Sequence, residues 1–203
     1  MDIIIIILFS YISGSIPYGL IFTKTFAKID IREVGSGNIG ATNVLRTGKK
    51  TLAILTLILD IAKGFIPVFI TQKYFIELTH LSALLVFLGH VFPIWLKFKG
   101  GKGVATYLGI LFSLSLSLAI LFIFTWLIVS LIFKYSSVSS IFASFTVFVV
   151  TIIRENAVSA INSDLNIHND LNIILFIFFI LVIFTHKKNI SNLKNKKEKK
   201  IKI

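Results

Sequence analysis

Two glycine-rich segments carry the residue types that bind phosphate. The first reads GSGNIGATN from Gly35 to Asn43 and is followed by Arg46. Its glycines allow positive-φ conformations, and successive free amides in such a loop form a concavity for an anion. An arginine can hold a phosphate through two parallel hydrogen bonds. The expected ligand contacts are Ser36, Gly37, Asn38, Thr42, Asn43 and Arg46. The alternative is a flexible polar linker between helices.

The second segment reads FKGGKG from Phe98 to Gly103 and precedes an apolar run that begins at Val104. A helix that begins there would add its N-terminal amides and its dipole to an anion site. The segment lacks the frame of the nucleotide-binding P-loop, so it does not indicate ATP. The expected phosphate contacts are Lys99, Gly100, Gly101, Lys102 and Gly103. His90, shortly before them, could be a general base or an interhelical hydrogen-bonding group.

Two further polar clusters consist of residues spaced i and i+3. His186 and Asn189 follow the last apolar run, and a continuing helix would place them on one face. They could equally form an interfacial polar cap. Asp60 and Lys63 lie inside an apolar run, where an unpaired charge is costly, so we expect them to pair and to support the site. Spacing alone does not separate structural support from ligand binding at this pair.

The composition is that of a polytopic all-α membrane protein. Of the 203 residues 56% are hydrophobic and 15% are charged, and the mean hydropathy is +0.91. A soluble domain cannot cover so much apolar surface, and disorder requires low hydrophobicity. The net charge of +12 would suggest nucleic acid in a soluble chain. In a membrane chain it indicates orientation by cytoplasmic lysine and arginine, so we expect no nucleic-acid partner. The chain has no cysteine and no HExxH or paired-carboxylate motif, so we expect no metal or cofactor.

Charge distribution resolves how many helices cross the membrane. The apolar runs are Ile3–Phe22, Thr51–Thr71, His80–Trp95, Val104–Phe133, Ser136–Ile153 and Leu171–Thr185. Val104–Phe133 would form a helix about 45 Å long, too long for a single crossing of a core about 30 Å thick. Two helices there place 18 of the 21 Lys and Arg on one side, as the positive-inside rule requires. We therefore expect seven transmembrane helices, an outside N-terminus and a cytoplasmic C-terminus. The helical membrane domain would cover residues 1–186, and residues 187–203 would form a lysine-rich cytoplasmic tail.

At these residues the sequence resembles the bacterial acyl-phosphate:glycerol-3-phosphate acyltransferases, the PlsY family. The motifs that carry the resemblance are GSGNIGATNVLR (Gly35–Arg46), GHVFPIWLKFKGGKGVAT (Gly89–Thr106), SGSIPYG (Ser13–Gly19) and DIAKG (Asp60–Gly64). The family's third motif keeps His186, Asn189 and Glu198. It departs from the family where Lys187 and Asn192 replace arginines and where Lys196 stands in place of glycine.

The resemblance implies a reaction in a bacterial plasma membrane, with the active site on the cytoplasmic face. A fatty acyl group would pass from acyl-phosphate to the sn-1 hydroxyl of glycerol 3-phosphate, giving lysophosphatidic acid and phosphate. Another membrane-associated enzyme would supply the donor. By this resemblance the acceptor would be held by Ser36, Arg46, Lys102, His186 and Asn189. The hydroxyl proton could go to a substrate phosphate or to His90, and Ser36 as an acylated nucleophile is a third route.

Two other classes of protein could use the same residues. A transporter of phosphorylated anions would need these cations, but transporter sites tend to lie at the membrane midplane between repeats. The basic clusters here gather on one side instead. A non-catalytic scaffold could bind lipid through its tail, but it would not need both glycine-rich segments.

Overall fold

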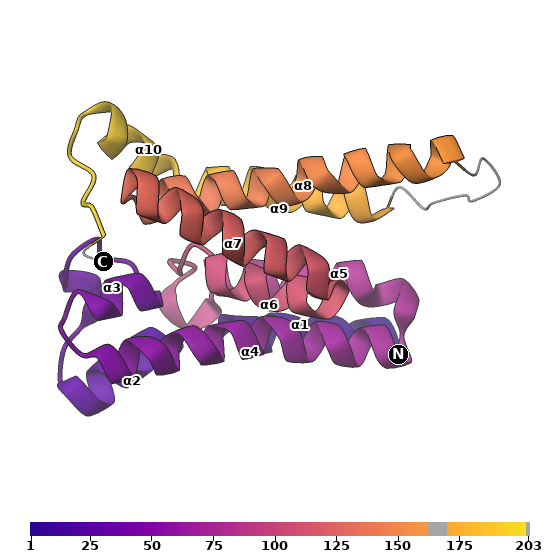
Figure 1. Ribbon diagram of the computed structural model, residues 1–203. Coiled ribbons are helices and arrows are strands. Elements are labelled where there is room, and N and C mark those ends of the chain that lie inside the picture. The colour runs from indigo at the N-terminus through magenta and orange to yellow at the C-terminus, as the bar shows by residue number, and fades with distance from the viewer. Residues whose placement is uncertain (162–169, 202–203) are drawn as a thin grey trace. The chain divides into compact units, whose positions relative to one another are not determined.

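The computed structural model describes residues 1–161 and 170–201, and every regular element in them is a helix (Figure 1). The expected all-α class is therefore confirmed for these residues. The chain divides into two compact units, Met1–Leu116 and Ser117–Ile203, and each is described by itself.

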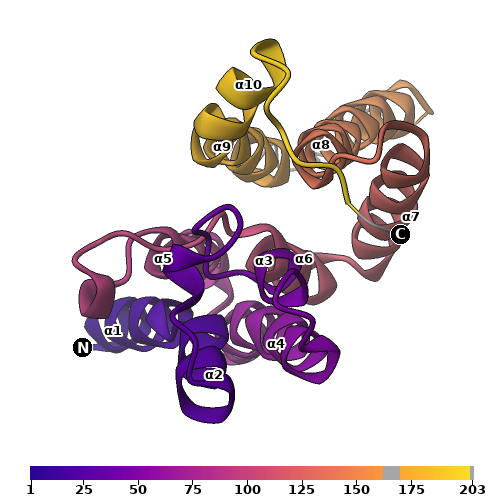
Figure 2. The same ribbon diagram turned by 90° about the vertical axis from the view of Figure 1, so that its left-hand side faces the viewer.

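Unit 1 is built around one long helix, α4 (Lys50–Tyr74). The other helices are α1 (Asp2–Ser15), α2 (Tyr18–Ala27), α3 (Ala41–Leu45), α5 (Thr79–Val91) and α6 (Val104–Leu114). Three 3-10 turns connect them: η1 (Ile31–Glu33), η2 (Ile76–Leu78) and η3 (Ile94–Leu96). All five of the other helices contact α4. Figure 2 shows α6 and α2 beside α4, with α1 and α5 towards the other side of the unit.

Small residues set the close helix packing in unit 1. Ser10 of α1 and Ser82 of α5 share a buried hydrogen bond of 2.8 Å, and a Cβ on Gly14 would overlap the Val86 carbonyl. Likewise a Cβ on Gly64 of α4 would overlap the carbonyl of Thr106 in α6. In a membrane, where lipid tails are as apolar as the core, such close backbone contact contributes strongly to helix association.

The first apolar run is bent, as its glycine and proline content predicts. α1 and α2 meet at 41° across Ile16 and Pro17. The residue before a proline is pushed into the extended region, and Ile16 has φ −66° and ψ 117°. The helix therefore stops at Ser15 and restarts after the proline.

The run Val104–Phe133 consists of two helices, as the charge argument predicts. Ser115 is extended, with φ −164° and ψ 115°, and separates the 11-residue α6 from the 18-residue α7 (Leu116–Phe133). A helix of 11 residues is only about 16 Å long, shorter than the hydrocarbon core. α6 begins beside the middle of α4, because Thr106 lies level with Gly64.

The chain is an integral membrane protein by the length and hydropathy of its helices. Four segments are long and apolar enough to cross a bilayer: Lys50–Tyr74, Ile76–Leu96, Leu116–Phe133 and Ser136–Ala157. The number rises to six if the bent pairs α1–α2 and α9–α10 each count as one span, with α6 a shorter apolar helix.

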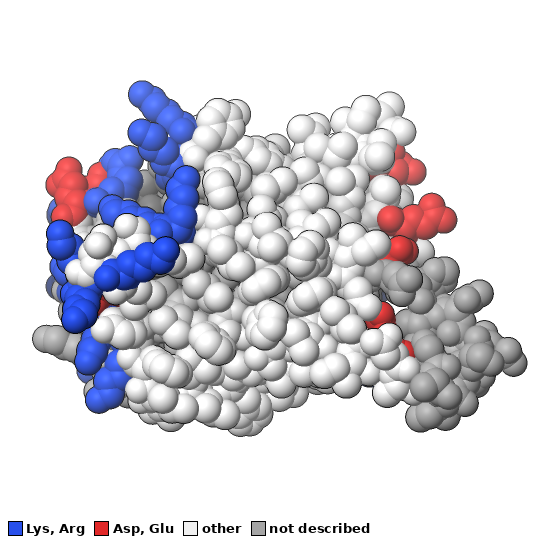
Figure 3. All heavy atoms as spheres, turned by 90° about the horizontal axis from the view of Figure 1, so that it is seen from above, with Lys and Arg blue, Asp and Glu red and all other residues white. Residues whose placement is uncertain are grey.

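Unit 2 contains α7, α8 (Ser136–Ile161), α9 (Asp170–Thr185) and α10 (Lys187–Lys194). α8 and α9 are antiparallel, because the rings of Phe145 and Phe179, and those of Phe148 and Phe176, pair with centroids 5.3 Å apart. In Figure 3 the Lys and Arg side chains gather at one end of the face with a few acidic side chains among them, and the other acidic side chains lie at the opposite end. In the sequence of this unit the lysines follow α7 and α9. This asymmetry follows the positive-inside pattern.

Candidate active site

Asn43 organises the first glycine-rich loop from inside. Its side chain is buried, and Nδ2 donates to the carbonyl oxygens of Ile31, Val34 and Asn38 at 3.1, 2.9 and 2.8 Å. Its Oδ1 accepts from the Ser36 amide at 2.9 Å. A single side chain thus contacts four backbone groups. The Ile31 and Val34 carbonyls also accept from the amides of Val34 and Gly37, whereas in the described part of the chain the Asn38 carbonyl and the Ser36 amide bond to Asn43.

Two glycines of this loop adopt left-handed backbone conformations. Gly35 has φ +61° and Gly37 has φ +72°. A Cβ on Gly35 would also overlap Oδ1 of Asn43 and lie 3.0 Å from Cδ of Arg46. Asn38 adds a tight turn by accepting from the Gly40 amide at 2.9 Å.

Three side chains of the loop point outward. Ser36, Thr42 and Arg46 are exposed. Within residues 1–161 and 170–201 their hydroxyl and guanidinium groups form no hydrogen bond or ion pair. The loop therefore presents two hydroxyls and one unpaired cation to a ligand, on a backbone held by Asn43.

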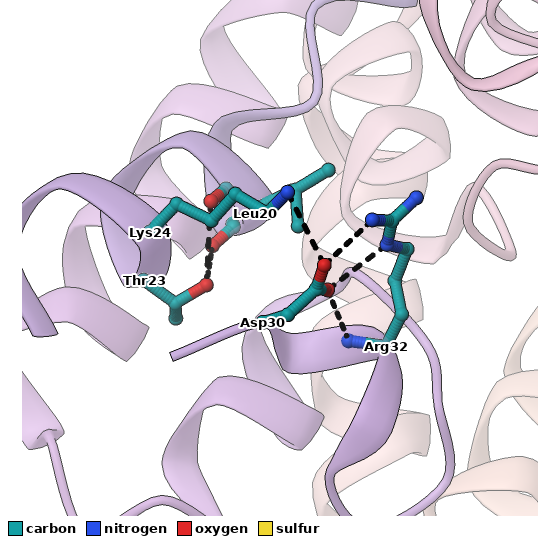
Figure 4. Close-up of polar contacts among 6 residues, drawn as sticks. Leu20, Thr23, Lys24, Asp30 and Arg32 are labelled. Atoms are coloured by element: carbon teal, nitrogen blue, oxygen red, sulfur yellow. Dashed lines mark hydrogen bonds and ion pairs between the residues drawn. The ribbon is translucent and has the colours of Figure 1, made fainter. Parts of the chain in front are cut away.

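A surface ion cluster fixes the entry to the loop. Asp30 accepts from Arg32 at 2.6 and 2.9 Å and pairs with Lys24 at 3.2 Å (Figure 4). Hydrogen bonding by Arg32, with a further contribution from Lys24, holds the pKa of the Asp30 carboxyl well below its usual range. The same contact raises the pKa of Arg32. Between these charges, Ile31 is fully buried in an apolar cluster with Leu20, Ile39, Val44 and Ala53, so the entry is held by both charge and packing.

The second glycine-rich segment is pressed against the end of α5. The amides of Gly100 and Gly101 donate to the carbonyls of Val91 and His90, each at 3.0 Å. These carbonyls belong to the last turn of α5, which has no later residues to satisfy them. The two amides are thus used within the chain, and Lys99 and the start of α6 remain as exposed charge and helix dipole. Lys102 is half-buried.

Glycine is required here because side chains of α5 fill the space. A Cβ on Gly101 would overlap Nε2 of His90, and one on Gly103, which has φ +81°, would overlap the ring of Phe87. Leu96, just before the segment, packs against the apolar cluster beneath the first loop. The chain leading into the second segment therefore shares an apolar cluster with Ile39 and Val44 of the first.

Asp60 and Lys63 form the pair expected from their spacing. Lys63 Nζ lies 2.8 Å from Asp60 Oδ1, and both side chains are buried. The same ammonium donates to the carbonyl oxygen of Ile16 at 2.7 Å, where α1 ends. His90 is buried beside this pair, with Nδ1 3.9 Å from Asp60 Oδ1. The spacing predicted the pair but not the contact of Lys63 with the Ile16 carbonyl, although the following Pro17 indicates a helix break.

In unit 2, His186 stands at a 54° bend between α9 and α10. It is buried, and its Nδ1 lies 2.8 Å from the Val182 carbonyl. Asn189 is also buried and donates to Glu198 at 2.6 Å, and Ser137 donates to the same oxygen at 3.1 Å. Sequence reasoning assigned no role to Glu198, although it is the sole acid among residues 187–203.

Comparison with known proteins adds a decisive observation. The family model described as glycerol-3-phosphate acyltransferase matches residues 4–196. The chain belongs to this acyltransferase family.

Individual acyltransferases are similar over most of the chain. The glycerol-3-phosphate acyltransferase of Pelagibacter ubique is 55% identical over 156 residues, covering 77% of this chain and 82% of the relative. That of Wolbachia pipientis subsp. Culex pipiens is 54% identical over 147 residues, covering 71% and 76%.

Crystal structures of an acyltransferase match the fold. PlsY, an integral membrane glycerol 3-phosphate acyltransferase, in its glycerol 3-phosphate form has a TM-score of 0.87 and 34% identity. The match covers 100% of this chain and 96% of that one. Its lysophosphatidic acid form gives a TM-score of 0.85 and 32% identity, covering 98% and 95%.

Proposed function

We propose that the chain transfers a fatty acyl group from acyl-phosphate to the sn-1 hydroxyl of glycerol 3-phosphate. The hydroxyl oxygen forms a bond to the acyl carbon, the bond from that carbon to the phosphate oxygen breaks, and the hydroxyl proton leaves with phosphate. The products are lysophosphatidic acid and inorganic phosphate. Family membership over residues 4–196 is the observation that carries this proposal.

The loop geometry supports phosphate binding in unit 1. The side chains of Ser36, Thr42 and Arg46 are exposed and have no partner among the described residues. The Asn43 side chain accepts a hydrogen bond from the Ser36 amide and so holds the backbone of the loop. Arg46 is suited to bidentate contact with a phosphate. Lys102 would contact the acceptor phosphate with Arg46, and Lys99 would add positive charge beside the start of α6. His186 and Asn189, whose side chains are buried within unit 2, are assigned to the acceptor by the family resemblance alone.

The burial of His90 favours a substrate phosphate as the proton acceptor. The imidazole is 4% exposed and its Nε2 faces the backbone of Gly101. A general base must reach the proton that it removes. An acyl-phosphate is already activated, so positioning and charge stabilisation suffice without an acylated Ser36.

We also propose the seven-span arrangement in a bacterial inner membrane, with the N-terminus outside and the C-terminus in the cytoplasm. α6 and α7 then count as two spans, α1–α2 as one, and α9 as the last. The lysine-rich tail at residues 187–203 and both glycine-rich segments lie on the cytoplasmic side of the membrane domain at residues 1–186. The donor would come from a separate acyl-phosphate-producing enzyme.

A two-donor assay on purified protein tests the reaction. Glycerol 3-phosphate is supplied with palmitoyl-phosphate or with palmitoyl-CoA, and phosphate release and lysophosphatidic acid are followed. Product from palmitoyl-phosphate alone is expected. At limiting glycerol 3-phosphate, Arg46→Ala, purified identically, should give much less product, whereas Lys49→Ala, which removes an exposed cation close by, should leave product formation unchanged. Product from neither donor in folded protein would overturn the proposal, and product from palmitoyl-CoA alone would overturn the donor assignment.

A further inference from the structure

The turn between α5 and α6 exposes large apolar side chains at the end of a membrane-spanning segment. Ile94, Trp95 and Phe98 are 53%, 60% and 57% exposed. The apolar span Ile76–Leu96 ends within this turn. Exposed apolar groups clustered in this way mark a contact surface.

Two lysines alternate with these side chains. Lys97 and Lys99 are exposed, and neither forms an ion pair anywhere in residues 1–161 and 170–201. A partner surface that is complementary to this turn has an apolar layer directly beside negative charge. The headgroup layer of an anionic leaflet has this composition, and tryptophan and lysine are typical of that depth.

The backbone of the turn is strained. Lys97 has φ +51° and Phe98 has φ +61°, so two consecutive residues with side chains occupy the left-handed region. The conformation is held by the Phe98 amide, which donates to the Pro93 carbonyl at 3.0 Å, and by Trp95 Nε1, which donates to Ser15 Oγ at 2.8 Å. Glycine would relieve the strain but would remove the ring of Phe98. Strain of this kind points to a role for the side chains that it displays.

We propose that residues 94–99, the aromatic–lysine turn, dock into the headgroup layer of an anionic leaflet. Trp95 and Phe98 lie at the level of the lipid glycerol, and Lys97 and Lys99 lie at the phosphates. The turn is continuous with Gly100–Gly103, so docking holds that segment at the depth of lipid phosphates. A membrane-dissolved acyl-phosphate would carry its own phosphate at this depth, and this last consequence rests on the proposed function.

Fluorescence quenching tests the depth of the turn without any enzymatic assay. The chain has two tryptophans, so Trp126→Phe leaves Trp95 alone, and Trp95→Phe leaves Trp126, in the middle of α7, as the matched control. Each variant is reconstituted into vesicles with a quencher on the lipid headgroup, or with bromine near the glycerol end or the methyl end of the chains. We expect Trp95 to lose most fluorescence to the headgroup and glycerol-end quenchers, and Trp126 to lose most to the methyl-end quencher. Quenching of Trp95 chiefly by aqueous iodide, or chiefly from the methyl end, would overturn the proposal.

A second experiment tests whether docking of the turn depends on anionic lipid. Replacing part of the phosphatidylcholine by phosphatidylglycerol should increase shallow quenching of Trp95. In the Trp126→Phe background, Lys97→Gln should abolish this increase, and Lys73→Gln, an exposed lysine at the far end of α4, should not. An equal increase in both variants would overturn the assignment of Lys97.

If Trp126→Phe does not fold, a spin label can report the same depth. The chain has no cysteine, so Phe98→Cys introduces one unique attachment site. Protection of the label from a water-soluble relaxant, with access to a headgroup-bound one, is expected, and the reverse overturns docking. Because neither readout uses turnover, failure of docking and failure of the acyltransferase reaction are distinguishable.

Discussion

Lys63 caps the broken end of the first helix: its Nζ lies 2.7 Å from the carbonyl oxygen of Ile16. Pro17 interrupts the hydrogen-bond ladder there, and the negative end of the α1 dipole is left inside the protein. Asp60, 2.8 Å from the same ammonium, balances the buried charge. Lys63 of α4 therefore contacts both the carbonyl at the α1–α2 bend and Asp60, which lies beside His90.

Lys63→Met should destabilise the protein strongly, because it leaves Asp60 buried without its partner and Ile16 without its donor. Removing one partner of a buried pair costs about 3–5 kcal/mol, whereas an exposed lysine can be replaced within about 0.5 kcal/mol. The midpoint of thermal unfolding in detergent measures the loss, with Lys73→Met as the exposed control. Adding Asp60→Leu should recover part of it. Equal midpoints for Lys63→Met and Lys73→Met would contradict the capping role.

Asn43→Ala should loosen the first glycine-rich loop. The Ser36 amide and the Asn38 carbonyl lose their partner, while the Ile31 and Val34 carbonyls keep a backbone donor, and each buried unsatisfied group costs about 1–3 kcal/mol. We expect turnover to fall by at least about tenfold, equivalent to about 1.4 kcal/mol, and residues 35–43 to become sensitive to limited proteolysis. Asn195→Ala, at an exposed position, is the control. A protease-resistant loop in Asn43→Ala would show that the glycines alone shape it.

Arg46→Ala should raise the KM for glycerol 3-phosphate more than it lowers kcat. A hydrogen bond to a charged group is worth about 1.5–3 kcal/mol, or about ten- to a hundredfold in affinity. Arg46→Lys should recover only part of the affinity, since an ammonium cannot make the bidentate contact. Lys102→Ala should act in the same direction. An unchanged dependence on glycerol 3-phosphate in Arg46→Ala and Lys102→Ala would contradict their assignment to the acceptor.

The Asp30 cluster predicts an acid-dependent contribution to stability. The pKa of the Asp30 carboxyl is lowered in the folded protein, so the unfolded chain binds the proton more tightly. The contribution is full above the ordinary aspartate pKa of about 4 and is lost as the pH falls through the lowered folded value. Asp30→Asn should therefore lower the thermal midpoint at pH 7, by an amount that shrinks on acidification.

The control for that experiment is Glu33→Gln, an exposed acid in the same turn that forms no ion pair in the described part of the chain. Its effect on the midpoint at pH 7 should be the smaller of the two. A difference between Asp30→Asn and the unaltered protein that is constant from pH 7 to pH 3 would contradict the role of the Asp30 ion pairs.

Hydropathy, glycine and proline content, and charge are local properties of the chain, and from them the helices, the bend near Pro17 and the division of residues 104–133 could be predicted. The same local reasoning identified both glycine-rich segments and the Asp60–Lys63 pair. It could not separate inward from outward polar side chains, because their partners come from other parts of the chain. Asn43 and Arg46 looked alike as ligand contacts until the fold surrounded one with backbone carbonyls and left the other exposed. The third partner of the buried pair, Ile16, likewise exists only because packing brings α4 to the point where α1 ends.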